Sequence, residues 1–171
     1  MMRFLPAIGL SCTLALMAVP GFAQKDQKDQ KNQRARTAGE VAAGTFAWGH
    51  DLSYVRDHFV KAAEEFPEDR YNYRPTEEVR TFGEIIMHVA RVNHLTAANA
   101  LGKEPEDVRE FAFHSKAEAV AKLKKSFEEL AEVVKQKPGK LDPDVLIHTS
   151  EHYGNLVVYY RLNGLVPPAS R

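Results

Sequence analysis

The chain has 171 residues, which is enough for one domain with a sizeable core. Hydrophobic residues make up 44% and charged residues 27%, a composition typical of ordinary globular proteins. The formal net charge is zero, so the composition gives no sign of a nucleic-acid partner or of an acidic membrane surface.

The first 23 residues have the order of a secretory signal peptide. A positive start at Arg3 precedes an apolar run over 4–19, and the small residues Gly21 and Ala23 then form a cleavage motif. We therefore predict export to the periplasm or the extracellular space, with no stable membrane insertion after cleavage. The alternatives are an uncleaved anchor, for which the run is short, and a lipoprotein start at Cys12, which is weaker still. Cleavage would remove the only cysteine.

Residues 24–37 form a polar, lysine-rich segment that we predict to be a disordered linker. Its stretch over 24–36 contains no large apolar residue, so it cannot bury enough surface to offset the entropy lost on ordering. The remaining residues, 38–171, are expected to form one domain.

Apolar residues recur at helical spacing in this domain, and helix caps punctuate the pattern. The first helix is expected over about 39–65, with one face formed by Trp48, Leu52, Val55 and Phe59. The second is expected to start at a capping box formed by Thr81 and Glu84 and to stop at Gly102.

The third helix is expected after a similar capping box at Ser115 and Glu118, and should end before Pro138. Asp142 and Pro143 favour the start of a fourth, which should end near Asn163. Four helices without a convincing strand predict an all-α four-helix bundle. The long second connection could cross over the bundle, so a simple up-down topology is not assured.

Three histidines lie on predicted inward faces. His148 and His152 are four residues apart, which places both rings on one side of the fourth helix, in line with Val145 and Leu156. His88 lies on the inward face of the second helix. Because unpaired imidazoles are costly to bury, we predict that His88, His148 and His152 bind one divalent metal ion.

The other four histidines are weaker candidates. His94 follows His88 by six residues, about 240° around a helix, and should not share its site. His50 and His58 could add a ligand, although solvent exposure is the preferred interpretation. His114 precedes a helix cap and is expected at the surface.

Three neutral histidines would leave the metal ion with open coordination positions, an arrangement that favours chemistry over a purely structural role. The ligand set suits zinc, nickel, iron or copper. Glu84 and Glu151 are candidate catalytic carboxylates, as a base or as hydrogen-bond support for the ligands. The alternatives are a capping role for Glu84 and simple exposure for Glu151. Metal affinity should fall below about pH 6.5, where free imidazole becomes protonated.

Two segments resemble the DinB-like superfamily, also called the DinB/bacillithiol-transferase-like fold. One runs over 66–88 and ends at His88, and the other runs from His148 to the double proline at 167–168. Many members follow the last histidine with Arg-Gly-Gln, whereas this chain keeps only the glycine, Gly154, of those three. The resemblance extends over about 40–171.

The resemblance implies a four-helix bundle with a metal ion, often zinc or nickel, on His88, His148 and His152, and dimers in some members. Iron, manganese or copper remain alternatives. Relatives include thiol transferases and a thiol-dependent isomerase, which suggests a metal-dependent transferase acting on a small-molecule thiol or electrophile. The signal peptide weighs against this, because such thiols are mainly cytosolic. The other hypotheses are a metal-dependent hydrolase of a small substrate and a non-catalytic metal- or ligand-binding stress protein.

Overall fold

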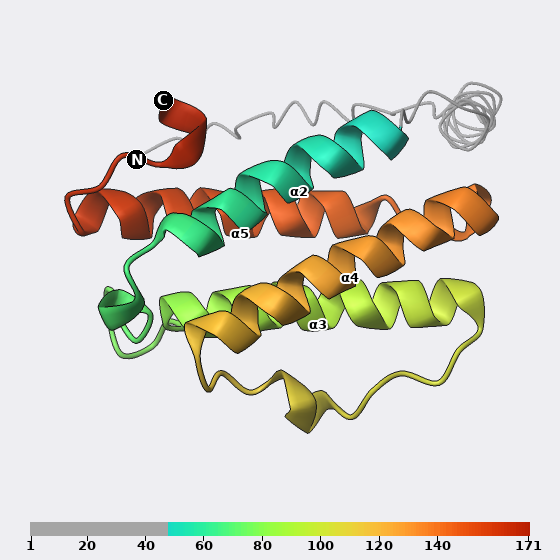
Figure 1. Cartoon of the computed structure of the whole chain (residues 1–171), viewed down its shortest axis with the longest axis horizontal. Helices are drawn as coiled ribbons and strands as arrows, with labels where there is room; N and C mark the ends of the chain where they lie inside the picture. Colours follow the sequence, from blue (N-terminus) through green and yellow to red (C-terminus); the bar gives the residue numbers. More distant parts are fainter. Residues whose placement is uncertain (1–47) are drawn as a thin grey trace, which may run out of the picture. The chain divides into compact units, whose positions relative to one another are not determined.

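The computed structural model describes residues 48–171, and this part of the chain is helical without strands. Its four long helices are α2 (Trp48–Glu65), α3 (Phe82–Leu101), α4 (Lys116–Gln136) and α5 (Asp144–Leu162) (Figure 1). Short 3-10 helices occur at Glu68–Arg70, Val108–Phe111, Pro138–Lys140 and Pro168–Ser170. The predicted all-α four-helix domain is confirmed in this range.

Several predictions lie outside the described residues. They are the signal peptide, the linker, the fate of Cys12 and the first part of the helix expected from residue 39. Within 48–171, no helix combines the length and the apolar content that crossing a bilayer requires.

The ends of α3 follow the predicted capping residues. The Thr81 hydroxyl accepts a hydrogen bond from the Glu84 backbone N–H, and the Glu84 carboxylate accepts one from the Thr81 backbone N–H at 2.6 Å, so the capping box is complete. Gly102 ends the helix with a φ of 72°, in the left-handed region that glycine adopts without strain.

The starts of α4 and α5 differ in detail from the expectation. At α4, Ser115 accepts from the Glu118 backbone N–H, but the reciprocal bond is not formed, so only half of the predicted capping box exists. Helix α5 begins at Asp144, slightly later than expected. Asp142 still acts on this helix start, because its carboxylate accepts a hydrogen bond from the Asp144 backbone N–H at 3.0 Å.

The helices are not arranged around the bundle in chain order. Helix α3 packs against α4 and α5, and α2 packs against the same two helices. The connection over 102–115 runs back along the bundle, so α3 and α4 point the same way while α5 runs opposite to both (Figure 1). The long second connection is therefore a crossover, and it makes α3 and α5 antiparallel neighbours.

An aromatic cluster fixes the irregular connection between α2 and α3. The rings of Phe66 and Phe82 stack with centroids 3.8 Å apart, and Tyr71 and Tyr160 pack around them. The Tyr160 hydroxyl donates to the Ala62 carbonyl at 2.7 Å. Because these side chains are fully or nearly fully buried, they hold the chain segment before α3, and with it Arg80, in a defined place.

Candidate metal site

The three predicted ligand residues meet between α3 and α5. His88 comes from the first half of α3, and His148 and His152 come from successive turns of α5. The inward face of α5 also carries Val145 and Leu156, both buried, so the histidines continue an apolar stripe. All three imidazoles are partly buried, which leaves their ring edges accessible from solvent.

The imidazole rings form a compact triangle. Their centroids are 5.0 Å apart for His88 and His148, 4.8 Å for His88 and His152, and 4.6 Å for His148 and His152. One ring nitrogen from each histidine lies within 4.8 Å of the others. The Nε2 atoms of His88 and His148 are 3.0 Å apart, close to the roughly 3.3 Å expected between two ligands of one tetrahedral zinc ion.

The described protein groups leave several imidazole nitrogens of this cluster without a good hydrogen-bond partner. The His88 Nε2 and His148 Nε2 atoms can form a hydrogen bond only if one carries the proton and the other does not. The buried Nδ1 of His148 has no partner among the described residues, and His152 Nδ1 has only a long contact of 3.5 Å with the Asn155 amide nitrogen. Three imidazoles converge here without a carboxylate among them, and a bound metal ion would satisfy their nitrogen atoms.

The surroundings keep the three imidazoles neutral. Burial, followed by the charges of neighbouring arginines and histidines, lowers the pKa of His88 and of His152 to about 4. Burial is also the main cause that lowers the pKa of His148, with smaller contributions from Arg80 and Arg91. Neutral imidazole is the form that ligates a metal ion, so the electrostatics prepare the triad for binding.

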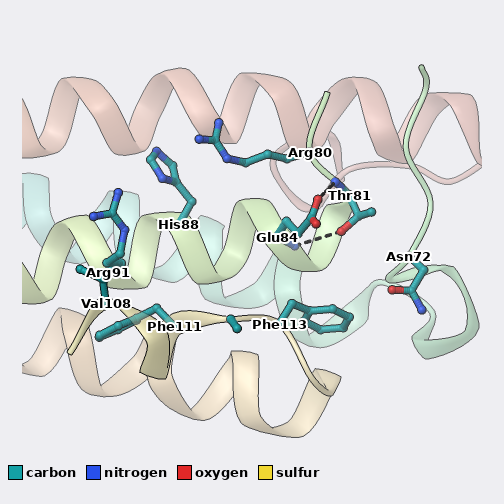
Figure 2. Close-up of a pocket in the computed structure, with 10 residues that line it drawn as sticks. Asn72, Arg80, Thr81, Glu84, His88, Arg91, Val108, Phe111 and Phe113 are labelled. Carbon is teal, nitrogen blue, oxygen red and sulfur yellow. Dashed lines mark hydrogen bonds between the residues drawn. The ribbon is translucent and has the colours of Figure 1, made fainter. Parts of the chain in front are cut away.

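Two pockets open on either side of the triad. One has a volume of about 760 Å³ and is lined by His88, Glu84, both arginines and the connection over 108–113. Figure 2 shows Arg80, His88 and Arg91 reaching to the same side of α3, toward α5. The second pocket, of about 530 Å³, is lined by His152, Asn155 and Tyr159, and Arg80 borders both. The triad is therefore bordered by one pocket at His88 and by another at His152.

Comparison with known proteins supports the same assignment. Residues 51–155 match the DinB superfamily, and this range contains all three histidines. The chain belongs to the DinB superfamily. No curated protein and no solved structure matches the chain. The resemblance inferred from the two sequence segments is thus confirmed for the DinB domain.

The two candidate carboxylates of the DinB domain differ in position. Glu84 lines the larger pocket together with His88, but its Oε2 atom is engaged by the Thr81 backbone N–H at 2.6 Å. Glu151 is exposed and lines neither pocket beside the triad, although its charge partly opposes the fall in the pKa of His148. Neither carboxylate belongs to the cluster that could hold a metal ion.

The remaining histidines lie outside the triad, as the sequence indicated. His94 is buried and links three parts of the chain, because its Nδ1 bonds the Glu129 carboxylate at 2.7 Å and its Nε2 accepts from the Glu106 backbone N–H at 2.9 Å. His50 and His114 are exposed. His58 differs from the preferred interpretation, because it is partly buried and packs against Tyr153.

Asn155 and Tyr159 both line the pocket beside His152. The sequence pattern did not single out Arg80 or Arg91. Arg91 follows His88 by three residues, and this spacing alone places the two on one side of a helix. Arg80 lies in an irregular segment without periodicity, so its position beside both pockets had no sequence signal.

Proposed function

We propose that this DinB domain binds one divalent metal ion, zinc or nickel first, on His88, His148 and His152, and uses it in a transfer reaction on a small-molecule thiol or electrophile. The convergence of the three imidazoles between two accessible pockets carries this proposal. A metal ion on three neutral ligands keeps open positions and its full charge, and supplies Lewis-acid activation of a thiol or of water.

The residues of the chain have separate parts in this proposal. The histidines, held on two packed helices, would hold the ion, and the pockets would admit substrate from either side. Of the two carboxylates, Glu84 is the better candidate for proton transfer, because it lines the pocket that His88 lines. Glu151 is exposed, which favours an ordinary surface role.

Elemental analysis of the purified protein tests the site directly. We expect about one zinc or nickel ion per chain, lost in His148→Ala and retained in His114→Ala, which removes an exposed histidine. A wild-type protein that takes up no divalent metal ion, or a His148→Ala protein that keeps the full amount, would disprove the site.

Activity assays test the reaction class. The metal-loaded protein is expected to conjugate low-molecular-weight thiols such as cysteine to 1-chloro-2,4-dinitrobenzene, and His88→Ala should abolish turnover. Hydrolysis of p-nitrophenyl acetate without added thiol would instead favour the hydrolase. A folded, metal-loaded protein without turnover in either assay would favour the non-catalytic metal- or ligand-binding role.

We also propose that the protein is exported, on the basis of the signal-peptide pattern in residues 1–23. Cell fractionation and N-terminal sequencing test this: the mature chain should begin at Gln24 and lie outside the cytoplasm. A chain that starts at residue 1 in the soluble cytoplasmic fraction would contradict export.

A further inference from the structure

The larger pocket combines two arginines with an apolar wall. Arg80 and Arg91 both line it, and His88 lies between them along α3 (Figure 2). On the side of the crossover connection, the lining residues are Val108, Phe111, Ala112 and Phe113. The pocket therefore offers positive charge beside His88, on the side of α3 toward α5, and apolar surface on the side of the crossover connection (Figure 2).

Among the described residues, no carboxylate forms an ion pair with either arginine. Within residues 48–171, the arginine ion pairs involve Arg56, Arg109 and Arg171, so Arg80 and Arg91 are without a carboxylate partner there. The one acidic side chain in the pocket lining, Glu84, is bonded to the Thr81 backbone N–H instead. Two guanidinium groups thus line a pocket in which, among the described residues, the Glu84 carboxylate already accepts a backbone hydrogen bond.

Arg80 is also held in place at its backbone. The Tyr159 hydroxyl donates to the Arg80 carbonyl at 2.5 Å, and the next residue, Thr81, is fixed by the capping box. Arg91 is partly buried on a regular turn of α3. The backbones of both arginines are therefore held in place, while the Arg80 side chain itself is exposed.

We infer that the substrate of this site is a small organic anion, an inference that rests on the proposed function. Its carboxylate or phosphate would bind to Arg80 and Arg91, and its apolar portion would pack against the connection over 108–113. Guanidinium groups match the geometry of both oxyanions and form charge-assisted hydrogen bonds to them. The volume of about 760 Å³ is sufficient for a small aromatic or branched molecule.

Binding of simple probes to metal-free and zinc-loaded protein tests this inference. Benzoate and phenyl phosphate present the two oxyanions on the same ring, and benzamide is the neutral counterpart. We expect isothermal titration calorimetry to detect benzoate or phenyl phosphate but not benzamide, and the stronger of the two anions identifies the preferred group. Added salt should weaken the binding.

Arg80→Gln and Arg91→Gln should each weaken anion binding about tenfold, because each removes a charge-assisted hydrogen bond. Arg161→Gln is the matched control, since Arg161 is exposed, unpaired within residues 48–171 and lines none of the pockets described here. Thermal unfolding and zinc uptake should be unchanged in all three variants.

Three results would overturn the inference: equal binding of benzamide and benzoate, equal loss in Arg161→Gln, or no anion binding in either form of the protein. Zinc uptake is measured separately, so its absence alone refutes the metal site and leaves the anion result to be judged by itself. Normal zinc uptake without anion binding refutes only the inferred substrate class.

Discussion

The three imidazoles of the triad are kept neutral by partial burial and by two neighbouring arginines. The free-imidazole value predicted loss of metal affinity below about pH 6.5. Because the pKa of all three histidines is lowered, to about 4 for His88 and His152, we instead expect the folded protein to lose its affinity only at lower pH. Competition with a zinc indicator at a series of pH values measures this, and a tenfold loss by pH 6 would contradict it.

The same pKa values predict how the stability of the metal-free protein depends on pH. An unfolded chain takes up protons at these histidines near pH 6.5, whereas the folded chain does so only near pH 4. Between these values the unfolded state binds more protons, so acidification favours unfolding. The histidine contribution to stability is complete above pH 6.5 and is lost progressively toward pH 4.

Urea denaturation of the metal-free protein between pH 7.5 and 4.5 measures this loss. His88→Gln and His152→Gln should show a shallower fall in the free energy of unfolding, because each removes a group with a lowered pKa. The exposed-site variant His114→Gln should follow the wild type. Identical slopes in all four proteins would refute the assignment of the pH dependence to the triad.

Tyr159 positions the segment that carries Arg80. Tyr159→Phe removes the donor to the Arg80 carbonyl and should lower the free energy of unfolding by about 0.5–1.5 kcal/mol. Tyr54→Phe is a matched control, because Tyr54 is 58% exposed and its hydroxyl makes no hydrogen bond to the described residues. Urea denaturation compares them, and an equal effect of both changes would rule out the positioning role.

At the scale of the elements, the crossover connection packs against the start of α3 through a glycine. A Cβ atom on Gly83 would lie 2.6 Å from the nearest carbons of the Phe113 ring, well inside van der Waals contact. Phe113 in turn stacks on Tyr71 with centroids 5.7 Å apart. The absence of a side chain at Gly83 therefore lets the connection close over α3 and form a wall of the larger pocket.

Two glycine substitutions should have opposite effects. Gly83→Ala should lower the free energy of unfolding by about 1–3 kcal/mol, because the Phe113 ring must move. Gly154→Ala, at an exposed position on α5 with open space around it, should raise it by about 0.5–1 kcal/mol through reduced backbone entropy. Urea denaturation measures both, and stabilisation by Gly83→Ala would contradict the packing described.

Local signals predicted the helices because their causes are local. The capping box at Thr81, the stop at Gly102 and the apolar stripe of α4 each depend on residues within a few positions of one another. The four-residue spacing of His148 and His152 likewise placed both rings on one face. The half-formed capping box at Ser115 shows the limit of such local prediction. A suitable pair of residue types does not ensure that both hydrogen bonds of the box form.

At the scale of the whole molecule, the triad joins two helices that are distant in the sequence. His88 and His148 are 60 residues apart, and the antiparallel packing of α3 on α5 brings them together. An ion bound by both helices stabilises the folded state alone, since the unfolded chain has no preformed site.

Zinc should therefore raise the melting temperature. At a free concentration of 100 times the dissociation constant, the stabilisation is about 2.7 kcal/mol, or on the order of 5–10 °C. Scanning calorimetry with zinc and with a chelator measures the difference. His148→Ala should show no response, and an equal zinc shift in that variant would place the bound ion elsewhere.

The order of the helices around the bundle could not be read from the sequence. Amphipathic stripes show which face of a helix is buried but not which helix covers it. Whether His88 meets His148 depends on the crossover, which is fixed by long-range contacts such as His94 with the Glu106 backbone and Phe113 with Gly83. Arg80 was missed for the same reason, because its place depends on Tyr159 of α5.

The place of α5 at the end of the helix order has a consequence for the order of assembly. Two of the three imidazoles belong to this last long helix, so a nascent chain that has not yet added α5 presents a single one. Such an intermediate would bind a metal ion weakly, because it offers one ligand in place of three. If the triad binds a metal ion as proposed, tight binding would therefore follow the docking of α5.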